Sequence, residues 1–335
     1  MSKIKIICTL GPKSFDKKTL ELLKKEKVDL FRINLSHTNL EDIEKTIKYL
    51  KRYNLKNICI DTEGAQIRTT ETNKKYFIKL GQFINIGNNS GSSNNKIINL
   101  YPNIDFKKIS IKSKIYIGFN NLCLQVLKKN IHKKILKCRV LSSGYLESKK
   151  GVHINLDLNL KPLTPKDIFG LKVAKKLKIK NYAISFVNNH KDLIEVKKIV
   201  GGNVNIISKI ETKNAIKNLA NIAKNSNALL IDRGDLSRYI PIETIPRAQE
   251  YIVKISKKIK KPTYVATNLL ETMIEKNGPT RAESHDIYST LKNGAQGLVL
   301  AAETAIGLDP VNCVRFLKKC INNFLHKNVL DKYIK

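Results

Sequence analysis

Two short apolar runs near the middle of the chain each lead into charged residues that could build a metal-assisted phosphate site. The run 203–209 leads to Lys209 and Glu211, and the run 227–231 leads to Asp235. Two carboxylates from neighbouring strand ends suit a hard divalent cation such as Mg²⁺, which keeps open positions for phosphate oxygens. A lysine two residues before the first carboxylate can stabilise charge on a transferring group. The alternative interpretation is a set of surface ion pairs at the starts of loops.

The same alternation of a strand and a helix runs through most of the chain. Short runs rich in β-branched residues are typical of buried parallel strands. Such strands are predicted at 3–9, 28–33, 57–61, 182–187, 203–209, 229–233, 262–267 and 297–301. Helices are predicted at about 17–27, 40–52, 164–178, 192–200, 213–224, 249–260, 281–293 and 311–325. Eight strand–helix units predict an α/β fold of the (β/α)₈ TIM barrel type. A doubly wound open sheet is the alternative, but no GxGxxG motif follows the first strand.

The stretch from about residue 70 to 155 has a different pattern. Its short alternating apolar runs are separated by turns rich in Asn, Gly and Ser, such as GNNSGSSNN. This predicts a small all-β domain, a barrel or a meander, inserted after the third strand. The predicted boundaries are 1–69 for the first part of the barrel, 70–157 for the inserted domain and 158–335 for the second part.

The residues at the carboxyl ends of the predicted strands are the candidates for chemistry, because active sites of parallel barrels lie at that face. They are Arg32, Asn34, Ser36, Asp61, Thr62, Arg68, Ser185, Lys209, Glu211, Arg233, Asp235, Thr267, Glu303 and Thr304. This set suits an anionic phosphorylated substrate held with Mg²⁺, because phosphoryl transfer depends mainly on positioning and charge stabilisation. No GxSxG, HExxH or Walker A motif is present. A Schiff base on Lys209 is the alternative, and the nearby Glu211 and Asp235 favour a metal site.

The formal net charge of +34 raises the question of a nucleic-acid partner. Only nine of the 62 basic residues are Arg, and the lysines are spread along the whole chain. The chain has no Trp and no basic motif interleaved with aromatic residues. We therefore expect no specific nucleic-acid partner.

The cysteines and the apolar runs indicate the cellular compartment in which the protein works. None of the six cysteines forms a CxxC pair or a Cys/His cluster, so neither a zinc site nor a disulfide framework is expected. Cys8 and Cys59 lie in apolar runs and are predicted to be buried thiols. No run approaches the roughly 18 apolar residues of a membrane span, and the N-terminus is interpreted as a strand. A cytoplasmic protein without a membrane partner is the expectation.

Several local motifs, taken together, resemble the pyruvate kinase family. They are KIICTLGPKS at 5–14, RINLSH at 32–37, DTEGAQIRT at 61–69, KKGV at 149–152, SKIE at 208–211, RGDL at 233–236, ATNLLETM at 266–273, PTRAE at 279–283 and ETA at 303–305. The resemblance covers nearly the whole chain and implies a barrel with a β-rich lid domain. It also implies an enzyme that converts phosphoenolpyruvate and ADP to pyruvate and ATP in glycolysis.

The resemblance implies a role for each matching residue. For the reacting groups, Glu211 and Asp235 would hold Mg²⁺ (or Mn²⁺), Lys209 would stabilise the phosphoryl group and the enolate, Arg32 would contact phosphate, and Thr267 would lie on the route that protonates enolpyruvate. The K⁺ ligands would be Asn34, Ser36, Asp61 and Thr62. The nucleotide side would be formed by Asn34, Arg68 and Lys150. The substrate carboxylate would be bound by the backbone amides of Arg233, Gly234 and Asp235.

Several positions depart from the family pattern, and three of them bear on the substrate or the activity. Asp232 stands where a small residue is usual, and Ala301 replaces a hydroxyl residue that assists proton delivery. Gln66 replaces the Glu of potassium-dependent members and the Lys of potassium-independent members, which leaves the potassium requirement open. The family's C-terminal regulatory domain is expected to be absent, and with it sugar-phosphate allostery. A homo-oligomer formed through barrel contacts is possible.

Three functions are therefore compatible with the sequence. The first is an active pyruvate kinase. The second is a pyruvate-kinase-like paralogue that acts on another enol phosphate or a 2-oxo acid, suggested by Asp232, Gln66 and Ala301. The third is a non-catalytic binding protein that uses its basic surface.

Overall fold

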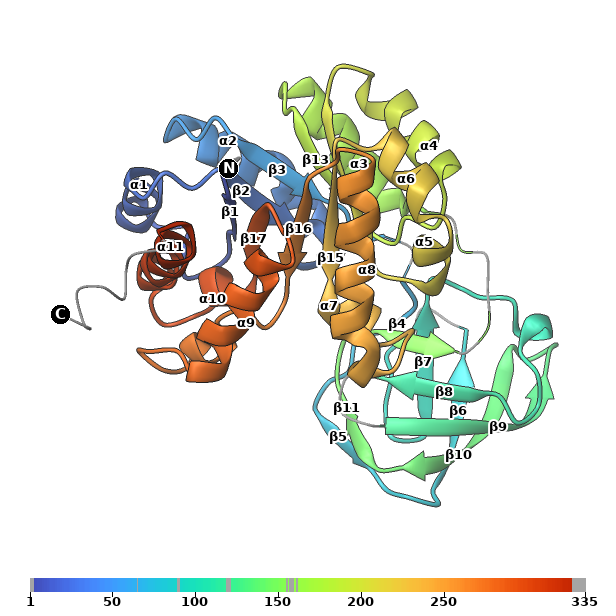
Figure 1. The fold of residues 1–335 in the computed structure, drawn as a ribbon. Coiled ribbons are helices and arrows are strands. Elements are labelled where there is room, and N and C mark those ends of the chain that lie inside the picture. The colour runs from blue at the N-terminus through green and yellow to red at the C-terminus, as the bar shows by residue number, and fades with distance from the viewer. Residues whose placement is uncertain are drawn as a thin grey trace. The chain divides into compact units, whose positions relative to one another are not determined.

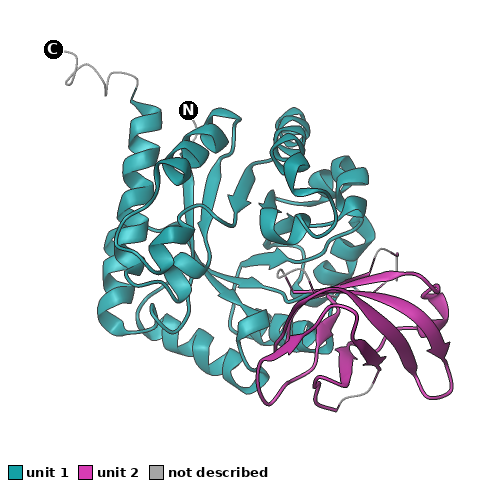
Figure 2. Ribbon diagram, turned by 90° about the horizontal axis from the view of Figure 1, so that it is seen from below, with its two compact units in different colours: residues 1–64, 162–335 teal, residues 65–161 magenta. Residues whose placement is uncertain are grey.

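The chain divides into two compact units, residues 1–64 with 162–335 and residues 65–161 (Figure 2). The computed structural model describes residues 3–64, 66–88, 91–118, 122–154, 156, 160 and 162–326. Among these residues, no helix is both long enough and apolar enough to cross a membrane.

The first unit is a closed barrel of eight parallel strands, which confirms the predicted (β/α)₈ fold (Figure 1). The strands follow one another around the barrel in the order β1-β17-β16-β15-β14-β13-β3-β2. Their bounds are β1 (Lys5–Thr9), β2 (Leu30–Asn34), β3 (Ile58–Asp61), β13 (Asn181–Ile184), β14 (Asn205–Ile210), β15 (Ala228–Asp232), β16 (Thr263–Ala266) and β17 (Gly297–Leu300). Each predicted strand is present, although most are shorter than the apolar run that predicted them.

Helices connect the barrel strands. Their bounds are α1 (Lys17–Lys25), α2 (Ile43–Arg52), α3 (Pro165–Lys176), α4 (His190–Val200), α5 (Lys213–Lys217), α6 (Leu219–Asn225), α7 (Arg233–Leu236), α8 (Ile245–Lys258), α9 (Arg281–Lys292), α10 (Ala302–Ala305) and α11 (Pro310–Leu325). The single helix predicted at 213–224 is wrong, because Asn218 separates α5 from α6. Its side-chain amide donates to the carbonyl of Asn188, at 2.8 Å, which holds this residue outside regular helical geometry. The one-turn helices α7 and α10 were not predicted.

The start of α3 is hydrogen-bonded to the chain on both sides of the inserted residues 65–161. Thr164 caps the helix, and Asp167 completes a reciprocal capping box with it. The Asp167 carboxylate also accepts from the backbone amides of Glu63, at 2.8 Å, and Gly64, at 3.1 Å. Burial raises the pKa of Asp167 to about 6, although hydrogen bonds from the backbone amides of Thr164 and Glu63 oppose the shift.

The second unit is all β, as predicted for the insertion. Its strands are β4 (Arg68–Thr69), β5 (Tyr76–Ile78), β6 (Phe83–Gly87), β7 (Ile97–Tyr101), β8 (Lys114–Ile117), β9 (Leu122–Asn130), β10 (Ile135–Ser142), β11 (Gly144–Leu146) and β12 (Val152–Ile154). Seven form one sheet, in the order β12-β8-β9-β10-β6-β7-β4, and β11 pairs with β5. Alternate residues of β10 are buried, so one face of the strand supplies this unit's own apolar core.

The inside of the barrel is built in layers, because alternate residues of a strand point to the same side. The lower layer is an apolar cluster that includes Ile7, Leu30, Cys59, Ala183, Ile207, Leu230, Tyr264 and Val299. The residues two positions further along several of these strands are polar: Thr9, Arg32, Asp61, Ser185, Lys209 and Asp232. The strand pleat therefore places a polar layer above the apolar one, towards the carboxyl ends of the strands. Cys8 and Cys59 are buried free thiols, as predicted.

Candidate active site

The polar layer includes two cations that lie within the strands, not after them. Arg32 is the third residue of β2 and Lys209 is the fifth residue of β14, and both are buried. The apolar runs of the sequence end near these two residues, which predicts a place at the strand ends. The polar side chains at these positions belong to the pleat of the barrel interior.

Arg32 and Asp61 form a buried ion pair between neighbouring strands. The Arg32 Nε donates to Asp61 Oδ2 at 2.5 Å, and the same guanidinium makes a second, shorter contact with that oxygen. Arg32 Nη1 donates to Thr9 Oγ1 at 2.7 Å. Burial acts to lower the pKa of Arg32, but the Asp61 carboxylate holds it above its usual value. Arg32 is therefore a fixed cation facing the barrel interior.

Lys209 lies at the centre of three carboxylates. Its Nζ is 2.8 Å from Glu211 Oε1, 3.3 Å from Asp232 Oδ2 and 3.6 Å from Asp61 Oδ2. It also donates to Ser185 Oγ at 3.1 Å. Burial alone would lower the pKa of Lys209, but the three carboxylates together raise it well above its usual value. The ammonium group therefore stays charged throughout the physiological range.

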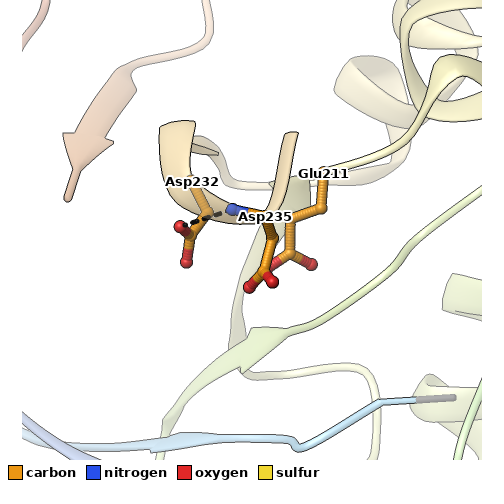
Figure 3. Close-up of side chains that lie close together, drawn as sticks. All are labelled: Glu211, Asp232 and Asp235. Carbon is orange, nitrogen blue, oxygen red and sulfur yellow. Dashed lines mark hydrogen bonds between the residues drawn. The ribbon is translucent and has the colours of Figure 1, made fainter. Parts of the chain in front are cut away.

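Glu211, Asp232 and Asp235 bring three carboxylates together (Figure 3). One oxygen of each lies within 4.8 Å of the others. Glu211 is fully buried, and its Oε2 accepts from the amide of Phe186 at 2.6 Å. Its Oε1 accepts no hydrogen bond of good geometry, although the Lys209 ammonium lies beside it. Burial raises the pKa of Glu211 far above its usual value, and Asp235 and Asp232 add to the shift while Lys209 opposes it.

Thr267 lies above this cluster in a strained backbone conformation. Its φ is 79°, in a region that β-branched residues rarely adopt. The Arg233 guanidinium holds it by donating from Nε to the Thr267 carbonyl at 3.1 Å, and Arg233 Nη1 is anchored by Asp286 at 2.9 Å. The Thr267 hydroxyl donates to Asp232 Oδ1 at 2.7 Å. Gly234 is needed here, because a Cβ atom would lie 2.9 Å from the Thr267 methyl group.

The residues matched to a potassium site lie around the ends of β2 and β3. Asn34 is the register partner of Asp61. The Asn34 side-chain oxygen accepts from the amide of Ser36 at 3.0 Å, at the start of a 3₁₀ turn. Thr62 is buried, and its hydroxyl oxygen accepts from the amide of Ser185 at 2.9 Å. The structure brings the four oxygen-bearing residues to one end of two adjacent strands, and their role as K⁺ ligands stays a prediction.

Arg68 and Lys150 belong to the inserted unit. The Arg68 guanidinium donates to the carbonyl of Lys149 at 3.0 Å, and the Lys150 ammonium lies 2.7 Å from Glu147. Both residues are therefore engaged within their own unit. Their assignment to the nucleotide side stays a prediction.

Some residues of the site were missed, and others proved to have a structural part. Thr9, Asp286 and Arg238 were not singled out, yet they contact Arg32, Arg233 and Asp235 respectively. Thr9 could have been found, because it lies two residues after the buried Ile7 on the same face of β1. Asp286 and Arg238 lie on or after helices, where no periodicity indicates that they turn towards the site. Glu303 accepts from the amides of Ala301, at 2.7 Å, and Leu270, at 3.2 Å, which makes it a brace for these loops.

A closed parallel barrel with this charged layer at its carboxyl end defines a TIM-barrel protein with the site of an enzyme. The sequence matches the family "Pyruvate kinase, barrel domain" over residues 1–314. The chain is 33% identical over 329 residues to a pyruvate kinase of Thermotoga maritima. It is 31% identical to pyruvate kinase isozyme G, chloroplastic, of Nicotiana tabacum and 31% identical to a pyruvate kinase of Staphylococcus aureus. The chain belongs to the pyruvate kinase family.

These alignments cover a larger share of this chain than of its relatives. They cover 95%, 94% and 95% of this chain, but 70%, 58% and 56% of the relatives from Thermotoga maritima, Nicotiana tabacum and Staphylococcus aureus. The chain therefore spans about 56% to 70% of the length of these proteins.

Proposed function

We propose that this protein is a pyruvate kinase, which transfers the phosphoryl group of phosphoenolpyruvate to ADP and yields pyruvate and ATP in glycolysis. The observation that carries the proposal is the charged layer of the barrel, where Lys209 lies between Glu211 and Asp232 and next to the Arg32–Asp61 pair. Family membership supports it, because the relatives named above are pyruvate kinases. Phosphoryl transfer needs such fixed charges more than it needs a strong nucleophile.

The donor set fits a divalent cation such as Mg²⁺ or Mn²⁺. Carboxylate oxygens are the preferred ligands of these hard cations. Glu211 and Asp235 would hold the ion, and the buried Glu211 Oε1, which accepts no hydrogen bond of good geometry and lies 2.8 Å from the Lys209 ammonium, is an available donor atom. When bound, the cation would offset the negative charge of the substrate's phosphoryl and enolate oxygens.

The protein's own cations would act on the reacting groups. Lys209 stays protonated, so it can stabilise negative charge on the phosphoryl group in flight and on the enolate that remains. Arg32 would contact the phosphoryl oxygens, since its guanidinium is fixed by Asp61 and Thr9 and has further donors. Both cations are pre-positioned in the free protein, so little reorganisation accompanies the reaction.

The remaining step is the delivery of a proton to the enolate carbon. We assign this route to the Thr267 hydroxyl, because strain and the Arg233 contact hold Thr267 at the edge of the site. The backbone amides of Arg233, Gly234 and Asp235 would bind the substrate carboxylate. Asn34, Ser36, Asp61 and Thr62 would hold K⁺, and Arg68 and Lys150 would contact the nucleotide together with Asn34.

The decisive test is a coupled assay that follows pyruvate formation from phosphoenolpyruvate and ADP with Mg²⁺, with and without K⁺. We expect turnover, and we expect Lys209→Met to lower it by at least about a hundredfold, because it removes a buried stabilising charge. Lys197→Met is a matched control, since Lys197 is a part-buried lysine that binds the carbonyl of Asn225 away from the site. It should leave the rate unchanged.

Two results would contradict the proposal. One is that the folded wild-type chain gives no turnover with or without K⁺ and shows no Mg²⁺-dependent binding of phosphoenolpyruvate. The other is that Lys209→Met keeps the wild-type rate while circular dichroism shows an intact fold, which would remove Lys209 from the mechanism.

A further inference from the structure

Asp232 is a carboxylate directed into the centre of the site. It is the last residue of β15, and its side chain is 14% exposed. Its Oδ2 lies 3.3 Å from Lys209 Nζ, and its Oδ1 accepts from the Thr267 hydroxyl at 2.7 Å. It therefore contacts two of the residues to which we assign the chemistry. Because of these contacts, the Asp232 carboxylate must affect the binding of any ion or substrate in the site.

The position of Asp232 also brings it into the carboxylate cluster with Glu211 and Asp235 (Figure 3). The three donor oxygens lie within 4.8 Å of one another. Carboxylate oxygens this close together form a donor set that a hard divalent cation could share. The spacing thus fits a shared ion.

The contacts of Asp232 orient its carboxylate without using up its donor capacity. A carboxylate offers about four lone-pair sites on its two oxygens. The Thr267 hydroxyl and a weak bond from the Asp235 amide, at 3.5 Å, both reach Oδ1, and Lys209 reaches Oδ2. Such outer contacts fix the direction of a ligand before a metal ion arrives.

The charges around the cluster are compatible with the binding of a divalent cation. Among the described residues, Lys209 contacts Glu211 and Asp232, and Arg238 Nη1 is 3.4 Å from Asp235 Oδ1. Arg32 is already engaged with Asp61. A bound divalent ion would add two positive charges to this cluster, and the added positive charge would favour an anionic substrate.

We propose that Asp232 is a third carboxylate ligand of the divalent cation held by Glu211 and Asp235, so that the barrel binds the ion tightly before any phosphorylated substrate arrives. This inference rests on the metal site of the proposed function. It makes Asp232 a binding residue that sets the order in which ion and substrate enter. Affinity for a hard cation rises with the number of charged ligands. A site with two carboxylates would depend more on substrate oxygens to complete the coordination.

The test is a Mn²⁺ titration of the full chain without substrate, with free Mn²⁺ measured by electron paramagnetic resonance. Asp232→Asn, which keeps the shape and removes the charge, should weaken Mn²⁺ binding by at least about tenfold. Asp232→Ala should do the same, and Asp232→Glu should retain most of the affinity. Asp42→Asn, which removes a carboxylate at the start of α2 far along the chain from the cluster, is the control and should bind as the wild type does.

Glu211→Gln separates this inference from the proposed function. If Glu211→Gln weakens Mn²⁺ binding while folded Asp232→Asn and Asp232→Ala stay within twofold of the wild type, Asp232 is not a ligand and the proposed metal site stands. If the wild type binds no Mn²⁺, or if Glu211→Gln has no effect, the metal site of the proposed function fails and this inference falls with it. Circular dichroism identifies any variant that has unfolded. If either Asp232→Asn or Asp232→Ala has unfolded, the Mn²⁺ affinity of the other one decides whether Asp232 is a ligand.

Discussion

Asp61 offers a sharp test of how the polar layer is held together, because replacing it by Asn removes one charge and little volume. The Asp61 carboxylate is fully buried and faces two cations, Arg32 in a direct ion pair and Lys209 at 3.6 Å. Asn in its place would leave Arg32 buried without its counter-ion. Removing one partner of a buried ion pair typically costs about 3–5 kcal/mol, and most of that is the penalty for the uncompensated charge. We expect Asp61→Asn to lower the free energy of unfolding by this amount.

Urea unfolding followed by far-UV circular dichroism measures the effect, since the chain has no Trp to report by fluorescence. Glu44→Gln is the control, because it breaks an exposed pair with Lys48 on α2 and should leave the unfolding midpoint unchanged. If Asp61→Asn lowered the free energy of unfolding by less than about 1 kcal/mol, the pair would not be buried as described.

A double variant tests the reason for this loss of stability. The double variant Asp61→Leu with Arg32→Met replaces both charges by apolar groups, so no buried charge is left unpaired. It should recover more than half of the stability lost in Asp61→Asn, because apolar replacements of buried ion pairs are often neutral or stabilising. A double variant that is less stable than Asp61→Asn would refute the reasoning, since the ion pair would then contribute net stability of its own.

Two further predictions concern stability. The pKa of Asp167 is raised to about 6 in the folded chain from an ordinary value of 3.8, so its protonated form is favoured by folding. The free energy of unfolding of the wild type should therefore fall by about 2 kcal/mol relative to Asp167→Asn as the pH rises from 4 to 7; urea unfolding across this range measures it, and a constant difference would contradict the assignment. Because Thr267 has a φ of 79°, Thr267→Gly should be more stable than Thr267→Ala by about 1 kcal/mol, although both lack the hydroxyl. Equal urea midpoints for these two variants would show that the backbone is not strained.

The barrel was predictable because its signal is local and repeated. Each barrel strand is a buried apolar run of four to six residues, and each is followed by helical periodicity. The break at Asn218 was not predictable, because its cause is a hydrogen bond to Asn188 from a different strand–helix unit. The short helix α7 was also missed, since four residues carry no periodic pattern.

The candidate site was predictable in its list of residues but not in its contacts. Lys209, Glu211 and Asp235 could be selected from the sequence because charged residues interrupt or follow buried runs. That Lys209 would lie between Asp61 and Asp232 depends on the register between β3, β13, β14 and β15, which the sequence does not state. The direction of the Asp232 side chain depends on a hydroxyl from the loop after β16. The assigned roles, the ions and the domain boundaries stay predictions.

The double attachment at Asp167 has a consequence for how the chain folds. Its Oδ2 binds the amide of Gly64, where the barrel chain departs, and the amide of Thr164, just after it returns. The barrel therefore closes this gap with its own hydrogen bonds, and the entropy of loop closure grows only slowly with the length of what lies between. The two ends of the chain around residues 65–161 are thus held near each other by contacts inside the barrel unit itself, and a short linker from Gly64 to Pro162 could span the distance between them.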